Sequence, residues 1–182
     1  AILQAEGKKL AFEVSVMPTV LFNGQRVSST MARDALAVGN LKQARELLGK
    51  PYSISGRVVH GDKTGRKIGY PTANIRIKHP RPALGGIFAV EIAGISEHPL
   101  KGVASLGVRP TVKDNGVPLL EVYVFDFDSE IYGQHVQVNF LHKLRDEEKY
   151  PDVETLKAQI DRDVKNAERY FNRRDAEAQR IA

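Results

Sequence analysis

Six short strand-like segments follow one another from residue 52 to residue 143 without a helical segment of comparable length between them. They lie near residues 52–59, 72–77, 86–93, 101–107, 119–127 and 135–143. Turn-forming glycines lie in or beside several of the gaps. A doubly wound sheet would need a helix after most strands. The pattern therefore predicts a mainly β fold, an antiparallel barrel or sandwich.

The C-terminal tail has a different periodicity. Apolar residues recur there at steps of three and four, at Val153, Leu156, Ile160, Val164, Ala167 and Phe171. This spacing predicts one long amphipathic helix, with Asp152 as its N-cap. We expect the helix to pack across the barrel.

Residues 1–50 contain too little material for an independent core. Segments 12–16 and 19–22 are strand-like, and Asn23-Gly24 is a tight-turn signal. Two short helices are predicted. The first covers residues 31–38, with its N-cap among residues 28–30, and the second is capped by Asn40 and ends at Gly49. Lys50-Pro51 is the expected boundary between this N-terminal part and a domain of residues 51–182. Because the chain begins with Ala1, we expect a fragment or a processed product.

The composition excludes several classes of protein. The chain has no cysteine, which rules out disulfides, thiolate zinc sites and a cysteine nucleophile, and which fits a cytoplasmic protein. No apolar run approaches the roughly 20 residues of a membrane span. The net charge is +5, but the basic residues are interleaved with acids, as in residues 143–149. That pattern is typical of a solvated face, so no nucleic-acid partner is predicted.

A glycine- and lysine-containing loop at residues 60–67 leads into the stretch Gly69-Tyr70-Pro71-Thr72-Ala73-Asn74. Gly61 and Gly65 would let backbone N–H groups approach an anion, and Lys63 would neutralise its charge. Thr72 and Asn74 lie on one face of an extended segment and offer the oxygen ligands that Mg²⁺ prefers beside nucleotide phosphates. The alternative is a flexible hairpin with polar residues at the end of a strand.

Alternation along residues 119–127 places Leu120, Val122 and Val124 on one face. Glu121 shares the other face with the rings of Tyr123, Phe125 and Phe127. Taken alone, the strand favours a charge at the rim with aromatic rings packed beneath the helix. The competing hypothesis is that the rings flank a planar ligand and Glu121 accepts a proton as a general base. Arg109, in a loop after the fourth strand, either closes over an anion or belongs to a plain β-turn.

Taken together, these motifs resemble the riboflavin kinase module of the bacterial bifunctional riboflavin kinase/FMN adenylyltransferases. The resemblance runs from Tyr52 to Phe171. Besides the stretch 69–74 it includes Gly86-Ile87-Phe88, Leu106-Gly107-Val108-Arg109-Pro110-Thr111, Leu120-Glu121-Val122, Tyr132-Gly133 and Phe140-Leu141-His142-Lys143-Leu144-Arg145. It implies a six-stranded antiparallel Greek-key barrel with a C-terminal helix.

The resemblance also implies roles for the candidate residues. Thr72 and Asn74 would bind the ATP phosphates and Mg²⁺, and Glu121 would deprotonate the ribityl 5′-hydroxyl of riboflavin. The loop with Gly61, Lys63 and Gly65 would cover the phosphates, next to Tyr70 and Pro71. The Arg109 loop would close on the flavin side. The aromatic face with Tyr123 and Phe125 would adjoin a planar ring.

Residues 1–50 resemble the end of the adenylyltransferase domain of the same enzymes, although Met31 replaces a commonly basic residue in their Ser-Ser-Thr-x-x-Arg stretch. The His-x-Gly-His signature of that domain is absent. The expected activity is therefore the conversion of riboflavin and ATP to FMN and ADP, without FAD synthesis. The alternatives are a non-catalytic flavin- or nucleotide-binding barrel and, more remotely, an oligonucleotide-binding barrel.

Overall fold

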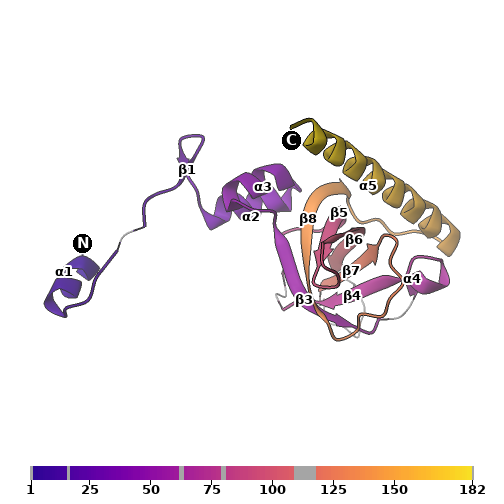
Figure 1. Ribbon diagram of the computed structural model, residues 1–182, viewed down its shortest axis with the longest axis horizontal. Helices are drawn as coiled ribbons and strands as arrows, with labels where there is room; N and C mark the ends of the chain where they lie inside the picture. The colour runs from indigo at the N-terminus through magenta and orange to yellow at the C-terminus, as the bar shows by residue number, and fades with distance from the viewer. Residues whose placement is uncertain (1, 16, 62–63, 79–80, 109–117, 182) are drawn as a thin grey trace.

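The structure is a computed structural model that describes residues 2–15, 17–61, 64–78, 81–108 and 118–181. Its centre is a closed barrel of six antiparallel strands in the order β3-β4-β7-β6-β5-β8. Figure 1 shows this barrel with the long helix α5 lying across one side of it. The predicted barrel and C-terminal helix are confirmed.

The barrel strands are β3 (Ser53–Val59), β4 (Thr72–Arg76), β5 (Gly86–Ala93), β6 (Leu100–Val108), β7 (Pro118–Val124) and β8 (His135–Arg145). The helices are α1 (Ile2–Lys9), α2 (Ser29–Ala37), α3 (Leu41–Leu48), α4 (Thr64–Lys67) and α5 (Val153–Ile181). A small hairpin joins β1 (Leu21–Phe22) to β2 (Gln25–Arg26) around the predicted Asn23-Gly24 turn.

Alternating residues of the strands fill the inside of the barrel. On β7 these are Leu120, Val122 and Val124, which are all buried as the alternation predicts. On β8 they include Val138 and Phe140. Strand β5 is buried on both faces, because its outward residues pack beneath α5. The interior is therefore a continuous apolar core rather than a binding cavity.

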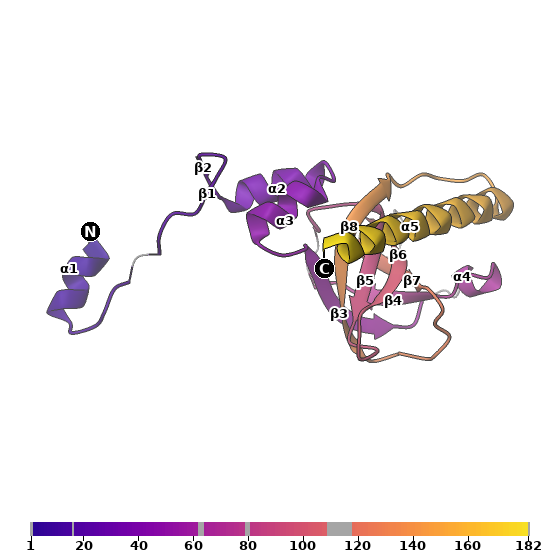
Figure 2. The ribbon, with the colours of Figure 1, turned by 45° about the horizontal axis from the view of Figure 1, so that its top comes forward.

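Helix α5 begins after Asp152, whose carboxylate accepts a hydrogen bond from the N–H of Thr155 (2.7 Å). Its side chains Ala167 and Phe171 pack on Ile87, Ala89 and Val103 of the barrel. Ion pairs from Lys101 to Asp175 (2.5 Å) and from Arg174 to Glu91 (2.7 Å) fix the second half of the helix. In Figure 2 the helix runs along the outside of β5 and β6.

Helices α2 and α3 form a pair beside the barrel, and their apolar side chains Ala35, Leu36, Leu41, Ala44 and Leu47 belong to the same core cluster as the barrel interior. Both predicted caps are present. Ser28 accepts a hydrogen bond from the N–H of Met31 (3.3 Å), and Asn40 accepts one from the N–H of Gln43 (3.1 Å). The second half of the N-terminal part is thus packed on the barrel.

Three local predictions were wrong. Residues 12–15 form no strand, and a helix, α1, lies before them instead. The predicted strand 119–127 ends at Val124, since Asp126 adopts a left-handed conformation (φ 51°) that breaks the extended chain. The loop 60–67 contains the short helix α4.

Residues 2–27 lie largely outside the packed body. Figures 1 and 2 both show α1 and the β1–β2 hairpin extending away from the barrel. Leu3, Leu10 and Leu21 are exposed there. Within the part of the chain that the structure describes, we find no helix with the length and apolar character needed to cross a membrane.

Candidate active site

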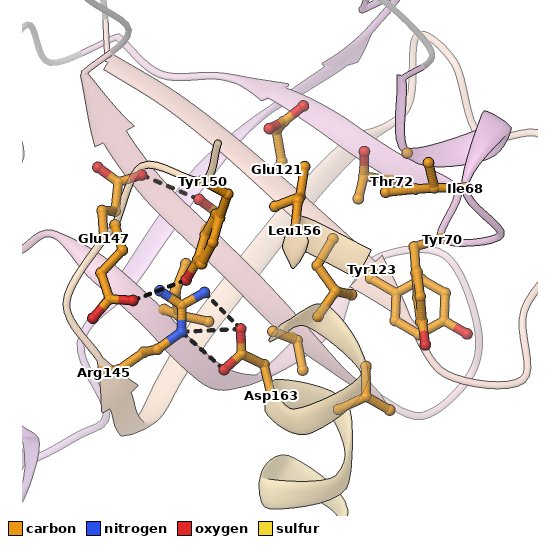
Figure 3. Close-up of a pocket in the computed structure, with 17 residues that line it drawn as sticks. Ile68, Tyr70, Thr72, Glu121, Tyr123, Arg145, Glu147, Tyr150, Leu156 and Asp163 are labelled. Carbon is orange, nitrogen blue, oxygen red and sulfur yellow. Dashed lines mark hydrogen bonds and ion pairs between the residues drawn. The ribbon is translucent and has the colours of Figure 1, made fainter. Parts of the chain in front are cut away.

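A cavity of about 280 Å³ lies between the barrel and α5 (Figure 3). The barrel wall carries Thr72, Glu121, Tyr123, Ile87, Val103 and Ser105. The opposite wall comes from α5, with Leu156, Ile160, Asp163 and Val164. The rim comes from the last residue of β8, Arg145, and from Glu147, Glu148 and Tyr150 in the segment that follows. A mostly apolar cleft with a few polar groups is the usual form of a small-molecule site.

The pairing of β4 with β7 brings the two predicted motifs together. Asn74 lies opposite Glu121, and Thr72 lies opposite Tyr123. Because Leu120 and Val122 point into the core, these four residues point outward, and three of them, Thr72, Glu121 and Tyr123, line the cavity. A hydroxyl, an amide and a carboxylate from sequence positions about 50 residues apart therefore share one small patch.

The glycines of the 60–67 loop allow the loop to lie directly on this patch. A Cβ atom at Gly61 would lie 2.4 Å from the side-chain amide nitrogen of Asn74, and Asn74 is correspondingly buried. A Cβ atom at Gly65 would lie 2.2 Å from the carbonyl oxygen of Tyr70 and 3.3 Å from the hydroxyl oxygen of Thr72. These two glycines are needed for close approach.

A second cavity, of about 480 Å³, opens where β4 begins and β7 ends. Its lining includes Arg66 of α4, Pro71 and residues 127–132. Thr72 lines both cavities. The start of β4 thus lies between two cavities. Two substrates between which a group is transferred could be held side by side in this arrangement.

A buried ion pair holds α5 against the floor of the first cavity. The single Nε–H of Arg145 is shared between the two carboxylate oxygens of Asp163 (2.9 and 3.1 Å), and Nη2 donates a further hydrogen bond to one of them (2.7 Å). Gln159 donates another to the same carboxylate (3.1 Å). Although burial opposes the charge of Arg145, its hydrogen bonds with Asp163 raise its pKa. The ring of Tyr150 lies beside the guanidinium in Figure 3.

Tyr70 links the cavity to the start of β4. Its hydroxyl donates a hydrogen bond to Asp161 on α5, and its ring meets that of Tyr123 edge-on, with centroids 5.1 Å apart. The hydrogen bond to Asp161, together with burial, raises the pKa of Tyr70 to about 12. The phenol therefore stays protonated, and it stays a donor, at every physiological pH.

The structure separates the aromatic residues of the predicted strand. Tyr123 and Glu121 line the first cavity. Phe125 packs on Phe171 beneath α5, with ring centroids 6.2 Å apart, as the structural alternative expected. Phe127 packs against the interior cluster and lines the second cavity, so it does not share the face of Glu121. Lys63 and Arg109 lie outside the described residues.

Sequence reasoning missed the rim of the cavity. Residues 143–149 were interpreted as a solvated face, whereas Arg145, Glu147 and Glu148 line the cleft. The hydroxyl of Ser105 donates a hydrogen bond to Glu147 (3.2 Å). The sequence did contain one signal for this rim. Asp163 places a carboxylate at the edge of the apolar stripe of α5, and a carboxylate that becomes buried there needs a cationic partner.

The patch of Thr72, Asn74 and Glu121 has the donor chemistry that suits Mg²⁺, which takes one or two protein oxygens and completes its shell with phosphates and water. The described residues contain no group of three His, Asp or Glu side chains that could hold a metal by themselves. The donor set therefore fits a metal that arrives with a nucleotide.

Three comparisons with known proteins bear on this site. The family model described as Flavokinase: Riboflavin kinase matches residues 48–171. The bifunctional riboflavin kinase/FMN adenylyltransferase of Haemophilus influenzae is 48% identical over 173 residues, which cover 94% of this chain and 56% of that protein. The protein of the same name from Escherichia coli K12 is 44% identical over 171 residues, with 93% and 54% covered.

Among solved structures, the crystal structure of a macrolide-efflux protein from Streptococcus pneumoniae superimposes with a TM-score of 0.72 and 37% identity. The match covers 87% of this chain and 53% of that one. The chain spans about half the length of the curated relatives named above.

Proposed function

The chain belongs to the riboflavin kinase family, and we propose on that premise that it transfers the terminal phosphoryl group of ATP to the ribityl 5′-hydroxyl of riboflavin. The products would be FMN and ADP. The observation that carries the proposal is the position of Thr72 between two cavities, with the carboxylate of Glu121 in the wall of one of them. The name of the streptococcal protein refers to efflux, and that description belongs to that protein alone.

We assign the flavin to the cavity beneath α5. Its walls combine aliphatic side chains with the ring of Tyr123, which suits a planar heterocycle. A ribityl chain that leaves this cavity toward Thr72 would bring its terminal hydroxyl to Glu121. The carboxylate of Glu121 would accept the hydroxyl proton as the hydroxyl oxygen bonds to the γ-phosphorus of ATP. The bond from that phosphorus to the bridging oxygen would break, and ADP would leave.

We assign ATP to the second cavity, so that its phosphates lie at Thr72, which lines that cavity, and extend toward Asn74, two residues further along β4. Gly61 and Gly65 support this placement, because they let the loop lie within contact of both side chains. Lys63, Arg66 and Pro71 would complete the phosphate side, and Arg109 would close on the flavin side. Phe125 would act only through its packing on Phe171.

A divalent metal, which we propose to be Mg²⁺, would be held by the oxygen atoms of Thr72 and Asn74. When bound, it neutralises charge on the phosphates during transfer. The side chains of this protein orient the two substrates and exclude water, which is most of what phosphoryl transfer requires of a protein.

We also propose that residues 1–50 are the end of an adenylyltransferase domain and that residues 51–182 are the kinase. On this proposal residues 1–182 by themselves make FMN but not FAD. The cytoplasmic location and the absence of a nucleic-acid partner stay predictions.

The test is a chromatographic assay of the chain with riboflavin, ATP and Mg²⁺ that monitors FMN, FAD and ADP. We expect FMN and ADP in equal amounts and no FAD. Riboflavin or ADP binding without any FMN would contradict the proposal and favour the binding-barrel alternative. Salt-sensitive binding of single-stranded oligonucleotides, with no binding of riboflavin or nucleotide, would favour the oligonucleotide-binding barrel.

The metal assignment has its own test. Asn74→Ala should weaken Mg²⁺-dependent nucleotide binding and lower turnover together, by about tenfold or more. Asn139→Ala, which removes another barrel amide that accepts a hydrogen bond from Gln137 (2.8 Å), serves as the control. An unchanged magnesium titration in Asn74→Ala would leave Asn74 with a structural role.

A further inference from the structure

One hydrogen bond connects the two sides of the proposed active site, and it involves Asp161, a residue to which the proposed function gives no role. The donor is the hydroxyl of Tyr70, and Asp161 lies 91 residues further along the chain, on α5. Among the residues that the structure describes, this is the only side-chain hydrogen bond between α5 and the segment from α4 to Thr72. The other polar ties of the helix run to β5, β6 and β8.

The backbone of Tyr70 follows the loop on the nucleotide side. Its N–H donates a hydrogen bond to the carbonyl of Gly65 in α4 (2.8 Å). Its own carbonyl oxygen lies so close to Gly65 that a Cβ atom there would be 2.2 Å away. Any shift of α4 toward bound phosphates would therefore move Tyr70 as well.

Asp161, by contrast, moves with the flavin side. Its neighbour Ile160 lines the cavity beneath α5, and so does Val164 one turn further along the helix. The ring of Tyr70 also abuts Tyr123, which lines the same cavity (Figure 3). Tyr70 also lines this cavity itself, together with Gly65 and Ile68, so a displacement of Tyr70 would alter the flavin side directly. Only the contact that carries the displacement on to the α5 wall, at Asp161, needs the hydroxyl.

We propose that Tyr70 and Asp161 form a latch that couples the nucleotide loop to the α5 wall, so that each substrate strengthens the binding of the other. Asp161 is then a positioning residue, which acts through Tyr70 and does not touch the reacting atoms. This inference rests on the proposed assignment of the two cavities. Since such coupling is reciprocal, the same factor should appear in the affinity of either ligand.

The experiment measures the dissociation constant of riboflavin with and without saturating MgADP, in the whole chain. In the wild-type protein we expect riboflavin to bind about 5- to 50-fold more tightly with MgADP, the usual size of such coupling. Tyr70→Phe keeps the ring contact with Tyr123 but loses the donor, and Asp161→Ala loses the acceptor. In both variants the coupling factor should fall to within about twofold of one.

Two further variants separate coupling from stability. Asp161→Asn keeps an acceptor oxygen and should retain most of the coupling. Asp175→Ala removes the Lys101 ion pair from the far half of α5 and should leave the coupling factor at the wild-type value. A merely structural role would lower both affinities in Asp161→Ala without changing their ratio.

Three outcomes would overturn the latch. In the first, Tyr70→Phe keeps the full coupling factor. In the second, Asp175→Ala loses as much coupling as Asp161→Ala. In the third, the wild-type protein binds riboflavin and MgADP independently, which would leave the proposed function intact. A wild-type protein that binds neither ligand would instead remove the proposed function, and the latch with it.

Discussion

The inside of the barrel and its outer face beneath α5 are built from the same strands, yet different interactions hold them together. On β7, Leu120 is fully buried among apolar side chains, whereas Glu121 and Tyr123 line the cavity beneath α5. The interior depends on packing alone. The outer face combines a small apolar cluster around Phe171 with polar ties between residues far apart in the sequence. One strand thus contributes to the apolar core with one face and to the wall of a cavity with the other.

The largest effect on stability is expected from a substitution that removes a side chain from the barrel interior. Phe140 is 1% exposed and meets Phe88 edge-on, with centroids 5.2 Å apart. Phe140→Ala should lower the free energy of unfolding by about 3–5 kcal/mol, because it removes a large side chain from a closed core. Urea unfolding measures this loss. Val153→Ala, at an exposed position of α5, is the control, and a Phe140→Ala loss below about 1 kcal/mol would contradict the account.

A smaller loss of stability is expected when the ion pair between Arg145 and Asp163, on the outer face of the barrel, is broken. Asp163→Ala would leave the guanidinium of Arg145 partly buried without its carboxylate, so unfolding should become easier by about 3 kcal/mol. Riboflavin affinity should fall as well, since Asp163 lines the cavity. Asp175→Ala breaks an exposed ion pair of the same helix and should change stability by less than about 1 kcal/mol. Equal losses of unfolding free energy in Asp163→Ala and Asp175→Ala would contradict the distinction between the partly buried and the exposed ion pair.

The smallest effect concerns His142, whose ring stacks on Tyr170 with centroids 4.9 Å apart. Burial, and then the positive charge of Arg173, lower the pKa of this imidazole below its ordinary value. The unfolded chain therefore binds a proton more readily, and His142 makes stability fall as the pH drops below about 6.5. His142→Gln should flatten the loss of stability between about pH 7 and pH 5, by less than about 1 kcal/mol because the ring keeps solvent contact. A steeper loss in the variant would contradict this sign.

The sequence was sufficient to predict the features that depend on neighbouring residues. The alternation of apolar residues predicted which face of β7 points inward, and the three- and four-residue spacing predicted α5. The polar side chains of Ser28, Asn40 and Asp152 predicted the helix caps. It also placed Thr72 and Asn74 on one face, and the structure adds that Glu121 lies opposite Asn74.

Features that depend on contacts between distant segments could not be predicted. The pairing of Arg145 with Asp163 and of Tyr70 with Asp161 requires α5 to lie across the barrel in one position. Residues 12–15 have a strand-like pattern, but within the part of the chain that the structure describes no strand pairs with them, and they are irregular. Propensity alone does not form a strand without a partner.

The central claim is that Glu121, on the outer face of β7, performs chemistry while the residues beside it in the strand only pack. The most direct measurement is the turnover and the riboflavin affinity of Glu121→Gln, with Glu91→Gln as a control carboxylate that pairs with Arg174. The account predicts that kcat falls by about 100-fold or more while the dissociation constant changes by less than about threefold. Turnover near the wild-type value in Glu121→Gln would contradict it.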